Sequence, residues 1–379
     1  MNKKELELYI HIPFCVRKCS YCDFLSAPAT EQTREAYMAA LFAEIGGRAK
    51  DYSDRTVTSI FIGGGTPSLL SGEQIGQLMD RIREQFAMAQ DAEITMEVNP
   101  GTASAEKLRN FYTAGINRLS IGMQSAQAEE LKNLGRIHDF EGFCQVYREA
   151  VEAGFTNINV DIMSGLPGQT LASYRDTLEK VLHLEPMPQH ISAYSLIVEE
   201  GTPFAAMAER GELPLPEEET ERAMYEETIE VLAKYGFHRY EISNYARDGY
   251  ECRHNVGYWI RRDYLGFGIG AASLIDNVRF QNEKSLRTYL AHPLESREEE
   301  QTLTVQDRME ETMFLGLRLT RGVSCVDFAE QYGRTVEEVY GEVIARNVAD
   351  GLLTVTERKE NQKKDRFLAL TKRGLDLSN

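Results

Sequence analysis

The sequence of 379 residues has too little positive charge for a general nucleic-acid-binding protein. It contains 42 Lys and Arg residues against 59 Asp and Glu residues, which gives a formal net charge of −17. Proteins that bind the phosphate backbone need a basic face, and proteins drawn to anionic lipid need clusters of basic residues. The composition therefore argues against both kinds of partner.

Long apolar segments are also missing. No run approaches the ~20 residues that are needed to span a bilayer. The amino-terminal stretch MNKKELELYIHI has neither the apolar region nor the small-residue cleavage site of a secretory signal. We expect a cytoplasmic protein that is not transmembrane. In that reducing compartment the six cysteines are not expected to form disulfides, and the clustered ones are expected to be metal ligands or catalytic groups.

Low-complexity tracts and short repeats are absent, but a strand-like apolar run followed by a helical stretch recurs. The runs are ELELYIHI, TVTSIFIGGG, EITMEVNP, INRLSIGMQS, NINVDIMSGLP and HISAYSLIVEEG. Ser71 and Gln74 predict a capping box at the start of one intervening helix. The alternation predicts an α/β fold with right-handed crossovers and a parallel sheet. We expect a partial (β/α)6 barrel, with an open doubly wound sheet as the alternative, and both place ligands at the carboxyl ends of the strands.

The pattern changes after about residue 210. An acidic loop precedes a long helical stretch, and an aromatic, strand-like region follows up to about residue 275. The polar run HPLESREEEQTL is the best candidate for a linker. We therefore predict a barrel with an extension over residues 1–290 and a smaller module over 304–379. Helical segments at 305–318, 324–332 and 335–350, followed by a hairpin, predict that this module is winged-helix-like, and we expect it to serve as a cap or partner surface.

The stretch HIPFCVRKCSYCDF places Cys15, Cys19 and Cys22 within eight residues and contains no fourth cysteine. One loop of this spacing can wrap three thiolates around an inorganic centre. A structural zinc ion normally takes four protein ligands, and so does a [4Fe–4S] cluster. Three ligands would leave one metal position open for a substrate, as in catalytic zinc sites. From the spacing alone, a structural zinc knuckle is the alternative.

Later strands end in unusual residues that would meet at the same edge of a parallel sheet. Gly63–Gly65 offer a backbone that a ligand can approach closely. Glu97 and Asp161 lie in apolar strands, where an unpartnered carboxylate is costly. Each therefore needs a donor, such as a ribose hydroxyl, an ammonium group or Arg136. The alternative is an internal ion pair with Arg118 or Arg136.

The C-x3-C-x2-C pattern, with Tyr21 before its last cysteine, resembles that of the radical S-adenosylmethionine (SAM) enzymes. YIHIPFC, GGGTPS, EVNP, RLSIGMQS, LGRIH, NVDIMSGLPGQT and HISAYSL further resemble the motifs of the oxygen-independent coproporphyrinogen III oxidases and their relatives. This resemblance implies a radical SAM barrel with a [4Fe–4S] cluster on Cys15, Cys19 and Cys22. It also implies that SAM contacts Tyr9, Gly64, Gly65, Thr66, Glu97, Gln124, Arg136 and Asp161.

Two departures separate this chain from the decarboxylating oxidases of that group. Phe24 stands where those enzymes have a fourth cysteine, and the first strand begins almost at once. Both features resemble the HemW branch, which implies haem as cargo and delivery to haem-requiring proteins, membrane-bound respiratory enzymes among them. The alternatives are a SAM-dependent oxidative decarboxylase of porphyrin biosynthesis and a zinc-stapled scaffold without redox chemistry.

The stretch ECRHNVGYWIRR is the second feature that resembles this branch, through its HNxxYW motif. A histidine is a good axial ligand for haem iron, and aromatic rings can pack on the porphyrin face. Arg261 and Arg262 could pair with the propionates. From the residues alone, simple packing is the favoured interpretation. The resemblance makes haem-binding candidates of His254, Asn255, Tyr258, Trp259 and Cys252, where Cys252 is either a second ligand or a buried thiol.

Overall fold

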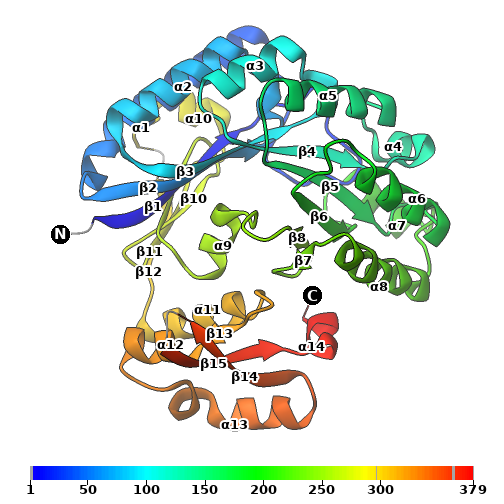
Figure 1. The fold of residues 1–379 in the computed structure, drawn as a ribbon. Coiled ribbons are helices and arrows are strands. Elements are labelled where there is room, and N and C mark those ends of the chain that lie inside the picture. The colour runs from blue at the N-terminus through cyan, green and yellow to red at the C-terminus, as the bar shows by residue number, and fades with distance from the viewer. Residues whose placement is uncertain (1–2, 296, 361–362, 379) are drawn as a thin grey trace.

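The protein consists of one large sheet covered by helices and a small module attached beneath it (Figure 1). The computed structural model describes residues 3–295, 297–360 and 363–378. The large sheet has 12 strands in the order β12-β11-β10-β9-β1-β2-β3-β4-β5-β6-β8-β7, and a second sheet has the order β13-β15-β14.

The centre of the large sheet is built from six parallel strands, each paired with the next along the chain. These strands are β1 (Lys4–Ile12), β2 (Arg55–Gly64), β3 (Ala87–Val98), β4 (Arg118–Gln124), β5 (Ile158–Ser164) and β6 (His190–Ser195). The helices between them are α1 (Glu31–Arg48), α2 (Gly72–Gln85), α3 (Ala105–Thr113), α4 (Ala128–Leu134), α5 (Phe140–Glu152) and α6 (Leu171–Leu182). Short 3-10 turns lie at Ala49–Tyr52, Pro67–Leu69 and Pro100–Thr102. The predicted α/β barrel-like order is confirmed, and so is the capping box of Ser71 and Gln74 at the start of α2.

Further strands extend this sheet at both edges. On one side, β9 (Tyr264–Phe267) pairs in parallel with β1 and leads to β10 (Ala272–Ile275), β11 (Val278–Asn282) and β12 (Arg297–Thr302). On the other side, β8 (Asn244–Ala246) pairs with β6 and with β7 (His238–Arg239). The helices of this region are α7 (Pro203–Glu209), α8 (Glu218–Lys234), α9 (Arg253–Trp259) and α10 (Leu286–Ala291).

Two segments in this region differ from the sequence-based expectation. The aromatic region that was expected to be strand-like contains the helix α9, which Figure 1 shows inside the curve of the sheet. The segment expected to be a linker contains β12, whose side chains are all exposed but whose backbone pairs with β11. The polar composition of this segment predicted a linker, but hydrogen bonding of its backbone to β11 makes it a strand. Ser296, within the same segment, lies outside the described residues.

The carboxyl-terminal part forms a compact module with its own apolar core. It contains α11 (Val305–Gly316), β13 (Val323–Ser324), α12 (Cys325–Tyr332), α13 (Val336–Ala349), β14 (Leu353–Glu360), β15 (Lys363–Leu370) and α14 (Lys372–Leu377). The three predicted helices and the hairpin are thus present. Met309, Phe328, Val336, Leu353 and Leu368 form the buried core.

Side chains from the barrel extension hold this module in place. Glu311 of α11 forms ion pairs of 2.8 Å with both Arg261 and Arg279. The guanidinium of Arg318 lies 4.5 Å from the ring centroid of Trp259. Because these contacts combine charge pairing with cation–π packing, they fix the module against α9 and β11.

None of the helices in the described part of the chain has both the length and the apolar composition that a bilayer crossing requires.

Glu44 joins the amino-terminal helix to the extension strands from a fully buried position in α1. Its carboxylate pairs with Arg48 at 2.8 Å and accepts hydrogen bonds from the Gly268 N–H at 2.9 Å and the Tyr289 hydroxyl at 2.7 Å. Asn282 donates a further bond of 2.7 Å. Although burial raises the pKa of Glu44, its partners satisfy the carboxylate from several sides.

Replacing Glu44 by Ala should therefore destabilise the fold strongly, because it leaves Arg48 and the donors of the extension buried without their acceptor. We expect a loss of about 3–5 kcal/mol in the free energy of unfolding, measured by urea titration with circular dichroism. The exposed Glu35 on the same helix is the control, and Glu35→Ala should change the value by less than about 0.5 kcal/mol. Equal effects of the two substitutions would contradict this role for Glu44.

Candidate functional site

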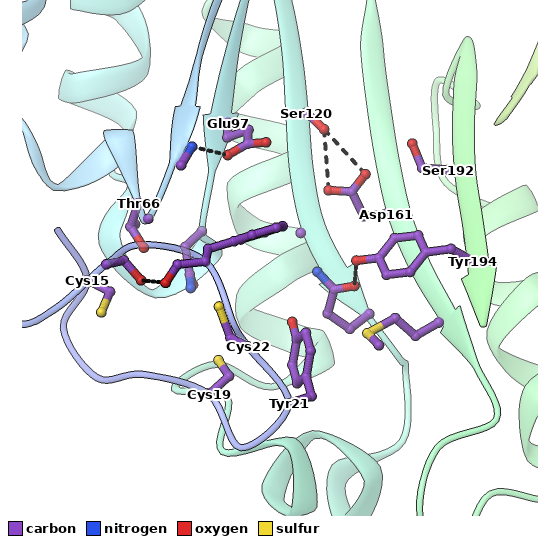
Figure 2. A pocket seen from close by; sticks show the side chains of 18 of the residues that line it. Cys15, Cys19, Tyr21, Cys22, Thr66, Glu97, Ser120, Asp161, Ser192 and Tyr194 are labelled. Atoms are coloured by element: carbon purple, nitrogen blue, oxygen red, sulfur yellow. Dashed lines mark hydrogen bonds between the residues drawn. The ribbon is translucent and has the colours of Figure 1, made fainter. Parts of the chain in front are cut away.

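A cavity of about 520 Å³ opens at the carboxyl ends of the six parallel strands (Figure 2). Loops from separate strands meet there because parallel strands all end at one edge of their sheet. Most of the residues predicted from the sequence line this one cavity. They are Cys15, Cys19, Cys22, Gly64, Gly65, Thr66, Glu97, Gln124, Arg136 and Asp161.

The three cysteines lie on the loop that follows β1, at the edge of the cavity (Figure 2). Backbone hydrogen bonds hold this loop, from Cys15 N–H to the Ala27 carbonyl at 3.2 Å and from Ser20 N–H to the Leu134 carbonyl at 3.0 Å. Cys15 is buried, whereas Cys19 and Cys22 are half-buried. Burial raises the pKa of the Cys15 and Cys22 thiols, so these groups need a bound metal to ionise readily.

The donor set of three thiols on one loop fits a [4Fe–4S] cluster that keeps one iron without a protein ligand. Within the described ranges, no group of three or more His, Cys, Asp or Glu side chains is placed to hold one metal ion. A cubane cluster binds each thiolate through a separate iron atom and needs its thiols spread around a space. Phe24, which stands in place of a fourth cysteine, is an exposed apolar side chain. The loop can therefore offer three thiolates and leave one iron without a protein ligand.

The glycine-rich end of β2 passes very close to the cysteine loop. A Cβ atom on Gly65 would lie 2.6 Å from the Phe14 carbonyl oxygen, and Gly64 has a φ of +114°. Both positions therefore require glycine, one for space and one for backbone conformation. The Gly64 N–H points at Glu97 and donates to its carboxylate at 3.1 Å.

Two buried carboxylates face the cavity beside this turn. Burial, reinforced by the charge of Asp161, raises the pKa of Glu97 to about 8, and the Gly64 N–H opposes that shift. Burial also raises the pKa of Asp161, which accepts a 2.7 Å hydrogen bond from Asn159 and bonds of 3.3 Å from Ser120.

Neither of these carboxylates forms an ion pair with an arginine among the residues that the structure describes. A direct ion pair with Arg118 or Arg136 is thus not formed among the described residues, although the charge of Arg118 lowers the pKa of Asp161 against the effect of burial. Both carboxylates retain acceptor capacity towards the cavity, which suits a ligand with hydroxyl or ammonium donors.

Arg136 and Gln124 also present polar groups to the cavity, and Arg136 lies beside Cys19 and Tyr21. Arg136 donates to the Gly122 carbonyl at 2.6 Å, and its buried Nε has no partner among the described atoms. Gln124 has a φ of 69°, which is costly for a residue with a side chain, by about 1–3 kcal/mol. Its amide oxygen accepts a 2.9 Å hydrogen bond from the Tyr194 hydroxyl. The strained backbone of Gln124 therefore occurs at a residue that lines the cavity.

Sequence reasoning gave no role to Tyr194, although HISAYSL was recognised as a motif. The available signal was the alternation along β6, which places Ser192 and Tyr194 on the same face, and both line the cavity.

Tyr9 is the predicted SAM-contact residue that does not line the cavity. Its hydroxyl lies 3.0 Å from Nδ1 of His11, and its ring packs against Phe61 at a centroid distance of 6.4 Å. The charge of Glu97 contributes to the raised pKa of Tyr9, after burial. Tyr9 therefore packs against Phe61 and His11 and does not border the cavity.

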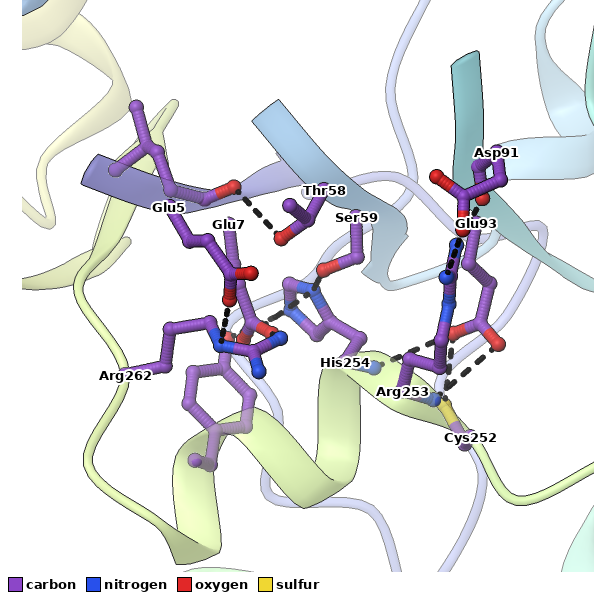
Figure 3. A network of polar contacts seen from close by, with 12 residues as sticks. Glu5, Glu7, Thr58, Ser59, Asp91, Glu93, Cys252, Arg253, His254 and Arg262 are labelled. Carbon is purple, nitrogen blue, oxygen red and sulfur yellow. Dashed lines mark hydrogen bonds and ion pairs between the residues drawn. The ribbon is translucent and has the colours of Figure 1, made fainter. Parts of the chain in front are cut away.

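His254 lies inside the barrel, on helix α9 (Figure 3). Its Nδ1 is 2.8 Å from the Ser59 hydroxyl and its Nε2 is 3.0 Å from the Tyr258 hydroxyl. Its backbone N–H donates to Glu93 at 3.3 Å. Burial, followed by the charges of Arg118 and Arg262, lowers the pKa of His254 to about 3. Both nitrogens of a neutral ring are engaged, so the prediction that His254 ligates haem iron does not fit this conformation.

The other haem candidates are divided between different surroundings. Asn255 lines the 520 Å³ cavity, whereas Trp259 borders a second cavity of about 440 Å³ beside the carboxyl-terminal module. Tyr258 packs edge-on against His254 at a centroid distance of 4.9 Å. Cys252 is fully buried, and burial raises its pKa to about 12, which supports the interpretation of an inert thiol.

The two arginines expected to meet propionates are paired inside the chain. Arg261 pairs with Glu311, and Arg262 lies 3.0 Å from Glu5 and 3.3 Å from Glu7 (Figure 3). The HNxxYW motif thus forms part of the barrel interior, where its partners come from strands that are distant in the sequence.

Comparisons with known proteins agree with this architecture. The Radical SAM superfamily model matches residues 9–181, and the HemN C-terminal domain model matches residues 303–377. A coproporphyrinogen III oxidase (HemN) structure from Escherichia coli, described as a radical SAM enzyme, superposes with a TM-score of 0.84 at 28% identity, covering 99% of this chain and 88% of the other. The fold and the site therefore define a radical SAM-type protein.

Proteins with similar sequences show which family within this class the chain belongs to. Heme chaperone HemW of Bacillus subtilis is 39% identical over 92% of this chain and 93% of its own length. Heme chaperone HemW of Escherichia coli is 38% identical over 92% of both chains. The protein belongs to the HemW family of radical SAM proteins.

Replacing Cys22 by Ala should abolish cluster binding, because the two thiolates that remain are too few to hold a cubane. After anaerobic reconstitution we expect about four irons per wild-type chain and less than one in the variant, measured by iron assay and by absorbance near 400 nm. Cys144→Ala, in helix α5, is the control and should retain iron. Zinc in place of iron, or iron retained by Cys22→Ala, would refute the cluster assignment.

The buried Glu7 should make the fold lose stability as pH rises. Burial raises its pKa from about 4.5 to about 8, with Arg262 opposing the shift. The folded chain therefore binds this proton more tightly than the unfolded chain, and stability falls between about pH 4.5 and 8.

Between pH 6 and 8.5, we expect the free energy of unfolding of Glu7→Gln to fall by about 1–3 kcal/mol less than that of wild type. Urea unfolding at each pH measures this difference. Glu97 titrates in the same range but is present in both proteins, so its effect cancels. Parallel pH profiles of the two proteins would show that Glu7 is already ionised in the fold.

Proposed function

We propose that this protein is a haem chaperone on a radical SAM frame, which binds haem and delivers it to haem-requiring proteins, membrane-bound respiratory enzymes among them. The observation that carries the proposal is the likeness to proteins named heme chaperone HemW over nearly the whole of both chains. Phe24 in place of the fourth cysteine of the related oxidases supports the same choice.

The proposed cofactors are a [4Fe–4S] cluster on Cys15, Cys19 and Cys22 and a SAM molecule in the adjoining cavity. When bound, the cluster supplies an open iron that can chelate the amine and carboxylate of the methionine moiety, and it supplies one-electron chemistry. The unpartnered Nε of Arg136 supports a role in holding a carboxylate. Glu97 and Asp161 would accept hydrogen bonds from hydroxyl or ammonium groups of the ligand, and Gly64 orients Glu97 through its N–H.

Backbone and amide groups complete the proposed SAM site. Gly65 and Thr66 bring the backbone of the β2 turn to the cavity, and Gln124, held by Tyr194, offers an amide there. Because Tyr9 packs against Phe61, which lines the cavity, its proposed contribution is to position that ring rather than to touch the ligand.

Helix α9 is the proposed haem-contacting element. It presents Asn255 to the main cavity and Trp259 to the second one, so a ligand can reach the helix from either side. One face of the Trp259 ring is covered by the Arg318 guanidinium, so the other face is the one proposed to pack on a porphyrin. Axial ligation by His254 would require the ring to leave both Ser59 and Tyr258, which are its partners in the folded barrel.

The second candidate function is the SAM-dependent oxidative decarboxylation of a porphyrinogen. The TM-score of 0.84 to a coproporphyrinogen III oxidase favours it, since the strands that carry the cavity have the same arrangement. Phe24, at the position of the fourth cysteine of the oxidases, argues against this decarboxylation.

One assay on a single reconstituted sample separates the two functions. With coproporphyrinogen, SAM and reductant, we expect no vinyl product within many hours. Haem added to the same sample should bind and give a Soret band that saturates at about one haem per chain. Transfer of this haem to an apo-haemoprotein would complete the test. Vinyl product at a steady rate, or haem absorbance identical to that of free haem, would overturn the chaperone assignment.

Two substitutions on α9 locate the haem contact. We expect Trp259→Ala to weaken haem affinity about tenfold, because it removes the largest ring on the helix. We expect His254→Ala to leave the Soret maximum unchanged, because both ring nitrogens already have partners in the fold. A shifted Soret maximum in a folded His254→Ala variant would restore His254 as the axial ligand.

A further inference from the structure

An arginine without a direct partner lies at the inner end of the main cavity. Arg118, the first residue of β4, is only 2% exposed, and it lines the cavity of about 520 Å³. Its buried Nε has no hydrogen-bond partner among the described atoms. Across residues 3–295, 297–360 and 363–378, no carboxylate lies within ion-pair distance of its guanidinium. A buried charged group that lacks a hydrogen-bond acceptor is costly, which makes this arginine unusual.

The alternation along β4 shows how deep Arg118 lies. Arg118, Ser120 and Gln124 share one face of the strand, and all three line the cavity. Because a strand rises ~3.3 Å per residue, Arg118 lies about 20 Å deeper than Gln124 along β4. The register pairs Ser120 with Glu97, so Arg118 also lies one inward-facing position deeper than Glu97. The proposed SAM contacts at Glu97 and Gln124 are therefore nearer the mouth, and the space beside Arg118 lies beyond them.

The polar groups on the wall above Arg118 already have partners. Asn159 donates to the Ser120 hydroxyl at 2.8 Å and to Asp161 at 2.7 Å, and the Ser192 hydroxyl donates to the amide oxygen of Asn159 at 3.2 Å. Figure 2 shows Ser120, Asp161 and Ser192 on neighbouring strands of this wall. Because these groups hydrogen-bond to one another, they leave the Arg118 guanidinium without an acceptor.

Two acidic side chains act on Arg118 through space without contacting it. Although burial disfavours the charged form of Arg118, nearby groups that include Glu93 and Asp161 keep its pKa raised. Glu93 itself accepts hydrogen bonds from the backbone N–H groups of Arg253 at 3.2 Å and of His254 at 3.3 Å. Arg118 is thus a charged, planar group whose own donors remain open towards the cavity.

We propose that the inner end of the main cavity binds a carboxylate of a second ligand, which Arg118 holds beyond the SAM site. A guanidinium presents parallel N–H donors that match the two oxygens of a carboxylate. Asn255 of α9 lines the same cavity and offers an amide to the rest of the ligand. The carboxylate can belong to a small organic acid or to a propionate of haem, because both have the same recognition chemistry. The inference goes beyond haem delivery and rests on the proposed SAM site only for its outer boundary.

The test is a calorimetric titration of the reconstituted protein at saturating SAM. Succinate is the small carboxylate, and succinamide is its neutral analogue. Arg118→Lys keeps the charge but removes the planar guanidinium, whereas Arg109→Lys, at an exposed position of α3, is the matched control. Urea unfolding checks that each variant folds, and the comparison of succinate with succinamide on wild type needs no variant.

We expect wild type to bind succinate with a Kd on the order of 1 mM, and succinamide at least about tenfold more weakly. Arg118→Lys should weaken succinate binding about tenfold, because an ammonium group cannot form the paired hydrogen bonds. Arg109→Lys should match wild type. Haem that displaces succinate would identify the carboxylate as a propionate, and succinate retained beside haem would identify it as that of a small organic acid.

Equal affinities of wild type for succinate and succinamide would overturn the proposal, and so would equal succinate affinities of wild type and folded Arg118→Lys. Succinate binding that SAM abolishes would also overturn it, because the carboxylate would then belong to the SAM site. Failure of the proposed function is distinguishable, since it would appear as missing haem binding or missing iron. The succinate titration of Arg118→Lys against wild type on cluster-free protein would still decide the inner site.

Discussion

The parallel pairing of β1 and β2 is the constraint on which the site depends. Their register places His11 beside Gly63 and Ile12 beside Gly64, so both strands end at the same level. The cysteine loop then has to cross the glycine turn, with the Phe14 backbone almost in contact with Gly65. Any side chain at that point would push the thiols away from the cavity. The position of three sulfur atoms is thus determined by a residue that has no side chain.

The same parallel order fills the barrel with polar groups that need partners. Glu7 and Ser59 point inward from β1 and β2, and α9 meets them with His254 and Tyr258 (Figure 3). His254 of this helix pairs with the Ser59 hydroxyl, and the helix also brings Asn255 to the cavity. One short element therefore closes the barrel and also contributes to the ligand chamber, which explains why its residues are found in two different cavities.

Much of this arrangement could be predicted from local patterns. Apolar runs followed by helical stretches predicted the six parallel strands, and the rule on strand ends brought Glu97, Gln124 and Asp161 together with the cysteines. The helices and the hairpin of the carboxyl-terminal module also followed from periodicity. These features depend on neighbours within a few residues or on a general property of parallel sheets.

The features that were missed depend on contacts between distant parts of the chain. The depth of His254 is determined by Ser59, which lies almost two hundred residues earlier, and the sequence around either residue does not reveal this pairing. Strand β12 forms because β11 offers an unpaired edge, although its own residues are charged. Tyr9 was assigned to the ligand by resemblance; alternation along β1 places it on the inward face with Glu7, where it packs against Phe61 and does not border the cavity.

Glu311 holds two arginines at once, and this shared anchor limits how the protein can move as a whole. A hinge between barrel and module would separate Arg261 and Arg279 from their common counterion and strand the buried guanidinium of Arg261. The two parts are thus expected to tumble together as a single rigid body. Release of a cargo then has to proceed through adjustments of side chains and of helix α9, and not by swinging a domain open.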